Sequence, residues 1–249
     1  MLPTGDVVEL TGDEGRHAGT VKRARIGETL LIGDGRGTVL SCRVTSVSPG
    51  RVALEVVDRV RTPASVPRLV VIQALPKGER AELAVELLTE LGVDGIVPWS
   101  ASRSVVQWQG ERATKALDRW RRTAREAAKQ SRRPWVPIVA PLASTSDVVA
   151  LMRAAGTALV LDEDASLSVA TVALGPAAAV GSAAAAGSAA AAGDVLVVVG
   201  PEGGISADEQ AQFVAVGAVA VRLGPAVLRT STAGAAACAA LSLRLGRWG

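Results

Sequence analysis

Two glycine-rich turns near the carboxyl end constrain the fold more than any other feature of the chain. Residues 195–199 form an uninterrupted apolar run, bounded by Asp194 and Gly200, which is typical of a strand buried on both faces of a parallel sheet. The turn at residues 200–204 (GPEGG) follows at once, and its glycines let backbone amides approach a ligand closely. We therefore expect a ligand-binding loop at the carboxyl end of this strand, where open α/β sheets place their sites.

Each of the two turns is followed by the signature of a helix start. Ser206 and Glu209 have the spacing of a capping box, which predicts that a helix begins after the first turn. A second, short strand is expected at residues 218–223 and is ended by Gly224 and Pro225. The hydroxyls of residues 230–232 then precede an alanine-rich segment. The sequence thus predicts two strand–turn–helix units close to the carboxyl end.

The preceding hundred or so residues repeat this alternation. Residues 69–75 and 95–98 are expected strands, and residues 79–91 between them are an expected helix with leucines 83, 87, 88 and 91 in the core and Gly92 as its C-cap. Residues 136–139 and 158–161 are further expected strands that flank a helix at 147–155. Strands that alternate with helices indicate an α/β domain with a parallel sheet.

The first 62 residues have a different pattern. Short β-type runs at 7–10, 28–32, 37–44 and 52–57 are separated by glycine turns, which predicts a small β-barrel. A proline-containing segment, residues 61–67, is the expected linker. We therefore expect domains at 1–62 and 68–249, with a low-complexity Ala/Gly/Ser insertion at 175–193 that carries no chemistry.

Charge and composition limit the classes of function. Residues 111–133 hold nine basic and three acidic residues, an excess of six, whereas the whole chain has a net charge of +3; this concentration favours a surface that faces a polyanion. The single histidine and the two distant cysteines, Cys42 and Cys238, argue against a metal site and a disulfide framework. The chain shows neither a signal peptide nor a membrane span, so we expect a cytoplasmic protein.

The motif of the two turns resembles that of a known family. GPEGG followed by S-x-x-E, and then LG-x-x-(V/I)LR-T-x-TA, is similar to the signature of the SPOUT-class RNA methyltransferases, and within them of the RsmE type, which methylates N3 of a uridine in small-subunit (16S) ribosomal RNA. The resemblance implies an N-terminal PUA-like RNA-binding β-barrel, followed by a SPOUT α/β domain with a C-terminal trefoil knot. It also implies S-adenosyl-L-methionine as the cofactor, ribosomal RNA or the assembled 30S particle as the substrate, and a homodimer.

The resemblance further implies which residues form the site. We expect the two turns, with the end of the strand at 158–161, to bind the cofactor through Leu161, Gly200, Pro201, Glu202, Gly203, Gly204, Leu223, Gly224, Val227, Leu228, Thr230, Ser231 and Ala233. Arg229 is the candidate that stabilises the charge of the deprotonated uridine. Glu202 is the remaining acid of the signature, and tying down its own loop is an equally good role for it. Ser231 stands where the family often has glutamate, so a carboxylate base at that position is absent.

The RNA-facing residues are expected in two regions. In the N-terminal domain a basic segment gives Arg16, Lys22, Arg23 and Arg25, together with His17, for which a turn-stabilising hydrogen bond is an equally good interpretation. In the second domain Arg103 and the helix segment with Arg125, Arg132 and Arg133 resemble family motifs. The tryptophans of this basic third of the chain serve either base stacking or, more commonly, packing.

These observations favour an RNA uridine-N3 methyltransferase. Two alternatives stay open at this point: a catalytically silent RNA-binding or ribosome-assembly factor, and a methyltransferase that acts on a different RNA position.

Overall fold

The chain divides into two compact units, residues 1–64 and 65–249, and the division lies within the predicted linker. The computed structural model describes residues 2–78, 80–175 and 193–248. The predicted insertion at 175–193 lies, apart from its two end residues, outside the described residues.

The first unit is built on an antiparallel sheet with the strand order β1-β4-β3-β2. The strands are β1 (Val7–Leu10), β2 (Thr29–Gly33), β3 (Thr38–Ser48) and β4 (Arg51–Arg61). All four strands were predicted, and β1 and β2 lie at the two edges of the sheet. A short helix, α1 (Gly12–Arg16), is followed directly by a π-helical turn, η1 (His17–Val21). Ala18 of this turn is part of the hydrophobic core of the unit. The sequence pattern gave no sign of this helical segment.

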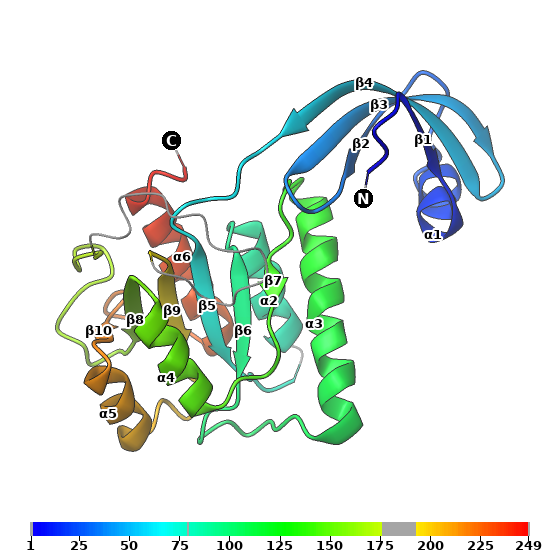
Figure 1. Ribbon diagram of the computed structural model, residues 1–249. Helices are drawn as coiled ribbons and strands as arrows, with labels where there is room; N and C mark the ends of the chain where they lie inside the picture. Colours follow the sequence, from blue (N-terminus) through cyan, green and yellow to red (C-terminus); the bar gives the residue numbers. More distant parts are fainter. Residues whose placement is uncertain (1, 79, 176–192, 249) are drawn as a thin grey trace. The chain divides into compact units, whose positions relative to one another are not determined.

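The second unit contains a six-stranded sheet in which every pairing is parallel, as predicted (Figure 1). Its strand order is β10-β8-β9-β5-β6-β7. The strands are β5 (Leu69–Ala74), β6 (Gly95–Trp99), β7 (Ile138–Val139), β8 (Thr157–Leu161), β9 (Val195–Val199) and β10 (Val219–Val221). The strand order reverses between β5 and β9, which are the two central strands.

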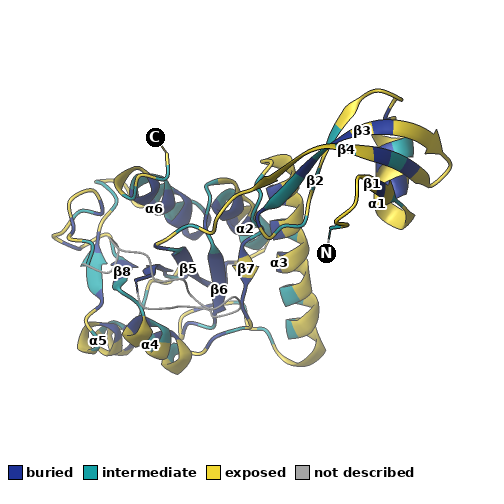
Figure 2. Cartoon of the chain, turned by 45° about the horizontal axis from the view of Figure 1, so that its top comes forward, coloured by how far each residue is buried: buried dark blue, intermediate teal, exposed yellow. Residues whose placement is uncertain are grey.

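Helices cover both faces of this sheet. Helices α2 (Arg80–Glu90), α3 (Gly110–Gln130) and α6 (Thr230–Arg244) pack on one face, and α4 (Thr145–Ala154) and α5 (Ala207–Ala215) on the other. Side chains of β9 alternate between the two cores: Val197 contacts the α6 side and Val198 the α4 side. The central strands are therefore buried on both faces, which explains the unbroken apolar sequence of β9. Figure 2 shows the burial of β5.

Two details of the helices differ from the prediction. Leu83 was expected in the core but is 41% exposed, because α2 packs against the sheet through Ala84, Val85 and Leu88. The helix that was expected to include residues 125–133 ends at Gln130, and Arg132 has a positive φ of 54°. The C-cap of α2 is as predicted, since Gly92 has a φ of 90°, which glycine adopts without strain.

The carboxyl-terminal residues are held by arginines that bond to distant backbone carbonyls. Arg244 donates to the carbonyl oxygens of Val169 and Val172, at 2.8 and 2.6 Å. Arg247 donates to the carbonyl oxygens of Gly92 and Pro67 and forms an ion pair with Asp94. The end of the chain is therefore fastened both to the segment after β8 and to the segments that precede β5 and β6.

Candidate functional site

The carboxyl ends of the parallel strands bring the predicted loops to one edge of the sheet. The loop after β9 (residues 200–204) and the segment between β10 and α6 (residues 222–229) lie at this edge, as do the turn after β5 and the loop after β6. Because parallel strands all end on the same side, residues that are more than a hundred positions apart in the sequence become neighbours. This edge is the candidate site.

Two positions of the GPEGG loop favour glycine, one because of its backbone conformation and one because another loop packs closely on it. Gly204 has a φ of 71°, a conformation that side chains rarely adopt, and its N–H donates to the carbonyl oxygen of Pro201 at 2.9 Å. A Cβ on Gly203 would lie 3.4 Å from both Cβ and the carbonyl oxygen of Arg103. Arg103 also donates from Nη1 to the carbonyl oxygen of Gly203 at 3.2 Å. The loop after β6 thus packs directly on the glycine loop.

The predicted capping box is present at the start of α5, and it does more than cap the helix. Ser206 and Glu209 exchange the two expected hydrogen bonds. The buried Glu209 carboxylate also accepts from the backbone N–H and hydroxyl of Ser102, both at 2.8 Å, and from the hydroxyl of Thr145 at 3.1 Å. Burial by itself would raise the pKa of Glu209, but the hydrogen bonds from Ser102 and Ser206 outweigh it and hold the pKa below its usual value.

The two predicted turns are joined by a direct hydrogen bond. The Thr230 hydroxyl donates to the carbonyl oxygen of Gly200 at 3.1 Å, so the first turn of α6 is attached to the glycine loop. The buried Gln73 amide lies beneath this contact and donates to the carbonyl oxygens of Ala74 and Thr230, at 3.1 and 3.5 Å. Gly234 lets α6 approach the sheet, because a Cβ there would lie 3.1 Å from Val199 Cγ2. The sequence reasoning did not single out Gln73.

The candidate cofactor-binding residues differ in exposure. Val227 and Leu228 are 75% and 40% exposed although they are apolar, whereas Thr230 and Ser231 are buried in the first turn of α6. Leu161, Leu223, Gly224 and Ala233 are partly buried. An adenosine group has a flat face, which apolar side chains can cover, and polar edges, which the backbone groups of glycines can hydrogen-bond. The residues at this edge therefore fit S-adenosyl-L-methionine.

The two catalytic candidates have different surroundings. Arg229 is the N-cap residue of α6, and its exposed guanidinium forms no hydrogen bond or ion pair with the described residues. Glu202 accepts a hydrogen bond from the backbone N–H of Lys77 at 3.1 Å. The carboxylate of Glu202 therefore ties the glycine loop to the turn after β5 through a backbone amide, which is the kind of bond that the alternative interpretation expected.

The basic residues predicted to face RNA are exposed, with one exception. In the first unit Arg16, His17, Lys22, Arg23 and Arg25 are all exposed, and the His17 imidazole forms no hydrogen bond with the described part of the chain. The structure thus gives no support to a turn-stabilising bond from this side chain. In the second unit Arg103, Arg125 and Arg132 are exposed as well.

The exception is Arg133, whose side chain turns into the protein. Its Nη1 donates to the carbonyl oxygens of Thr89 and Val93, at 2.7 and 2.9 Å, where α2 ends. Burial is the main reason that the pKa of this guanidinium is lowered. The prediction that Arg133 contacts RNA does not fit this geometry, because the side chain turns inward and Nη1 bonds to two backbone carbonyls.

Two of the tryptophans have packing roles. Trp99 is fully buried and its ring lies 5.5 Å from that of Phe213 in an edge-to-face arrangement. Trp120 is buried on the other face of the sheet. No group of histidine, cysteine, aspartate or glutamate side chains suited to a metal ion occurs among the described residues. None of the described helices combines the length and apolar character needed to cross a membrane.

Comparison with known proteins agrees with this geometry. A family model described as an RNA methyltransferase domain matches residues 62–242, and one described as an RNA methyltransferase PUA domain matches residues 10–57. The ribosomal RNA small subunit methyltransferase E of Mycobacterium bovis is 46% identical, over 98% of this chain and 89% of that protein. The chain belongs to this family of RNA methyltransferases. The resemblance of its two turns to the family signature is thereby confirmed.

Further relatives of the family extend over nearly the whole chain. The methyltransferase E of Bacillus subtilis is 32% identical over 94% of this chain and 88% of its own length. The crystal structure of methyltransferase E from Neisseria gonorrhoeae bound to S-adenosyl methionine superimposes with a TM-score of 0.82, at 28% identity, and covers 98% of this chain and 94% of that one. Both units of the chain therefore have counterparts in the family.

Proposed function

We propose that this chain methylates N3 of a uridine in small-subunit (16S) ribosomal RNA, with S-adenosyl-L-methionine as the methyl donor. The observation that carries the proposal is the hydrogen bond from Thr230 to Gly200, which joins the two signature turns at one edge of the sheet. Membership of the family supports the reaction class, and the relative from Neisseria gonorrhoeae with S-adenosyl methionine bound supports the cofactor.

The chain's own residues supply positioning and electrostatics. S-adenosyl-L-methionine supplies a methyl group on a sulfonium. N3 of the uridine forms a bond to the methyl carbon as the carbon–sulfur bond breaks and its electron pair stays on sulfur, and the N3 proton passes to water. The backbone of residues 200–204 and the apolar side chains of Val227 and Leu228 hold the donor. Orientation of the donor and the acceptor supplies much of the rate in a transfer of this kind.

Arg229 is the residue that we assign to the charge that develops on the uridine. A guanidinium stays protonated at neutral pH and stabilises negative charge on the oxygens beside N3. Its position at the start of α6 and its lack of partners among the described residues leave its donors available. Glu202 acts as a positioning residue through its bond to Lys77. Ser231 is buried and cannot replace the glutamate that the family often has there.

Nucleoside analysis tests the proposed function directly. The protein is incubated with labelled S-adenosyl-L-methionine and either deproteinised 16S RNA or 30S particles from cells that lack the gene. Digestion and mass spectrometry should show label in 3-methyluridine. Label in another nucleoside would assign the enzyme to a different position, and RNA binding without label would make the chain a silent binding or assembly factor.

The variant Arg229→Ala tests the assigned role of the guanidinium. We expect a fall in kcat of about 10²- to 10³-fold, the size found when one stabilising donor is removed, with the dissociation constant of S-adenosyl-L-methionine changed less than about two-fold. Equal losses of kcat and of cofactor affinity would mean that Arg229 builds the cofactor pocket and has no separate part in the reaction.

Three further features are part of the proposal. The fastening of the carboxyl terminus by Arg244 and Arg247 supports a trefoil knot in which α6 passes back through the chain. The outer side of α6, with Leu243 64% exposed, supports a homodimer formed through this helix. The protein acts in the cytoplasm, where ribosomal RNA is assembled into subunits. Sedimentation of Leu243→Arg should show monomers where the wild type is a dimer.

A further inference from the structure

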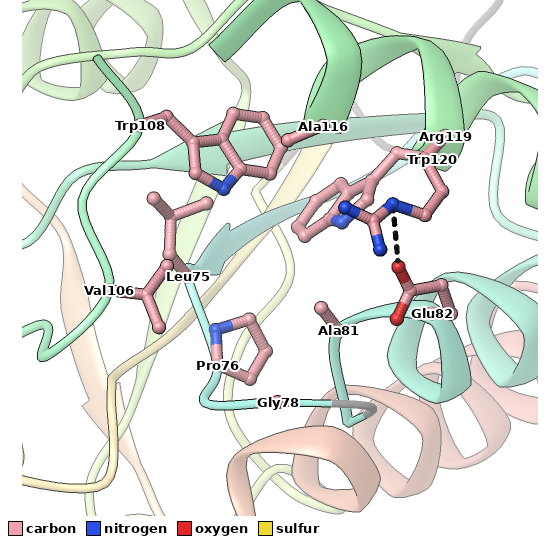
Figure 3. A pocket seen from close by; sticks show the side chains of 10 residues that line it. All are labelled: Leu75, Pro76, Gly78, Ala81, Glu82, Val106, Trp108, Ala116, Arg119 and Trp120. Carbon is pink, nitrogen blue, oxygen red and sulfur yellow. Dashed lines mark ion pairs between the residues drawn. The ribbon is translucent and has the colours of Figure 1, made fainter. Parts of the chain in front are cut away.

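A pocket of about 380 Å³ lies at the carboxyl end of β5, and it contains none of the predicted cofactor-binding residues. The turn after β5 forms its floor, α2 and α3 form its sides, and the segment before α3 closes it (Figure 3). Its lining residues are Leu75, Pro76, Gly78, Ala81, Glu82, Val106, Trp108, Ala116, Arg119 and Trp120.

Two indole rings that form part of the lining have N–H groups without acceptors. Trp108 is partly buried and Trp120 is 1% exposed; their ring centroids are 5.2 Å apart and the rings are nearly perpendicular, at 82°. Neither Nε1 donates a hydrogen bond to any of the described residues. Neither Nε1 is among the buried polar atoms that lack a partner, so both N–H groups are accessible to a molecule in the pocket. These donors therefore point to a ligand that carries hydrogen-bond acceptors.

The rim of the pocket is charged. Arg119 Nε lies 3.2 Å from the carboxylate of Glu82, and the Arg119 side chain is 59% exposed, so its remaining nitrogens are accessible. Figure 3 shows this ion pair beside Trp120, with Trp108 on the other side of the pocket and Leu75, Val106 and Pro76 below Trp108 in this view. Apolar walls with a cationic, hydrogen-bonding rim suit a flat heteroaromatic ring attached to a phosphate backbone.

The pocket is connected to the cofactor edge through one turn. Pro76 and Gly78 line the pocket, and Lys77 between them donates its N–H to Glu202 of the glycine loop. Helix α3, which supplies Arg119 and Trp120, also carries residues 111–130 of the basic run at 111–133. A strand of RNA that follows α3 to the glycine loop therefore passes the mouth of the pocket.

We propose that this pocket binds one unpaired base of the substrate RNA that flanks the target uridine in the same strand. The inference rests on the proposed function. Recognition of single-stranded RNA commonly stacks splayed bases on aromatic side chains and hydrogen-bonds their edges. The carbonyl and ring-nitrogen acceptors of the base satisfy the indole N–H groups, and Arg119 contacts the base or its phosphate.

Substitutions at Trp108 test the proposal, since this side chain is only partly buried, whereas Trp120 is 1% exposed. With 30S particles or 16S RNA as substrate, Trp108→Leu should raise KM for RNA about ten-fold or more, the size expected for one lost base stack. Trp108→Phe keeps an aromatic face without the N–H and should give a smaller increase. The affinity for S-adenosyl-L-methionine should not change. Val105→Ala, in the same segment but outside the lining, is the control.

A KM for RNA within two-fold of the wild type in Trp108→Leu would overturn the proposal while leaving the proposed function intact. Sedimentation of the same variant checks a second occupant: if the substitution turns a dimer into a monomer, the pocket is a contact between subunits, and the proposal is wrong.

Photocrosslinking gives a readout that does not depend on turnover. RNA with 5-iodouridine at single positions around the target should crosslink to the peptide that contains Trp108 from one flanking position, and Trp108→Leu should abolish this crosslink. Crosslinks from the target position itself, or none to this peptide from any position, would contradict the proposal. A wild-type protein that crosslinks but transfers no methyl group would instead refute the proposed function.

Discussion

The buried carboxylate of Glu209 gives the sharpest test of how the site edge is held together. It accepts hydrogen bonds from two backbone N–H groups, those of Ser102 and Ser206, and from the hydroxyls of Ser102, Thr145 and Ser206. Replacement by alanine leaves both N–H groups without their acceptor. A hydrogen bond to a charged group contributes about 1.5–3 kcal/mol, and the hydroxyls can rotate to other acceptors, so the two N–H groups decide the loss. We therefore expect Glu209→Ala to lower the free energy of unfolding by about 3–6 kcal/mol.

A matched control lies on the neighbouring helix. Ser144 and Asp147 form a capping box of the same geometry at the start of α4, but both are exposed. Asp147→Ala therefore removes the same motif without the burial, and we expect a loss of about 1 kcal/mol. Urea unfolding at pH 7 of both variants and the wild type compares the two values. A loss for Glu209→Ala that is no larger than that for Asp147→Ala would refute the reasoning.

The pH dependence of the same variants provides a second check. Because the folded-state pKa of Glu209 lies below its ordinary value of 4.5, its carboxylate stabilises the fold fully above pH 4.5, and the contribution is lost as the pH falls from 4.5 through the folded-state value. The difference in unfolding free energy between the wild type and Glu209→Gln should therefore be constant from pH 7 down to pH 5.5 and should shrink below pH 4.5. A difference that stays constant through the acid range would contradict the assignment.

The remaining predictions concern the packing of α6 against the sheet. Gly234→Leu places a side chain where even a Cβ would lie 3.1 Å from Val199 and 3.3 Å from Leu88. Overpacking of this kind should lower the free energy of unfolding by at least about 2–3 kcal/mol. The control, Ala236→Leu on the partly exposed side of the helix, should lower it by less than about 1 kcal/mol, and equal losses would refute the contact. Burial raises the pKa of Cys238 to about 12, so an aromatic disulfide reagent at pH 8 should leave this thiol unmodified until urea unfolds the protein, and rapid labelling of the native state would refute its burial.

Features that depend on residues close together in the chain were predictable from the sequence. The apolar run of β9, the capping box of Ser206 and Glu209, and the C-cap glycine at Gly92 are all found where the pattern placed them. Each of these depends on backbone geometry within a few residues, and the sequence determines that geometry directly. The parallel sheet followed in the same way, from strands that alternate with helices.

Sequence patterns predicted less well which side chains are buried, because this depends on the neighbours that pack against each helix. Leu83 fits the helical spacing of the core but is exposed, because small residues of α2 make the close contact with the sheet. Arg133 belongs to a basic run, yet its guanidinium bonds to carbonyls at the end of α2. Charge counts cannot distinguish a side chain that faces solvent from one that caps another helix.

The sequence alone therefore determined the strands, the turns, the order of the domains and the family signature. The tertiary structure decided which distant groups meet: Thr230 with Gly200, Glu202 with Lys77, and Trp108 with Trp120. These pairs depend on the order and direction of strands in the sheet, which bring together residues that have no local relation. The physical reason is that hydrogen bonds and packing between loops act over a few ångströms in space, whatever the separation along the chain.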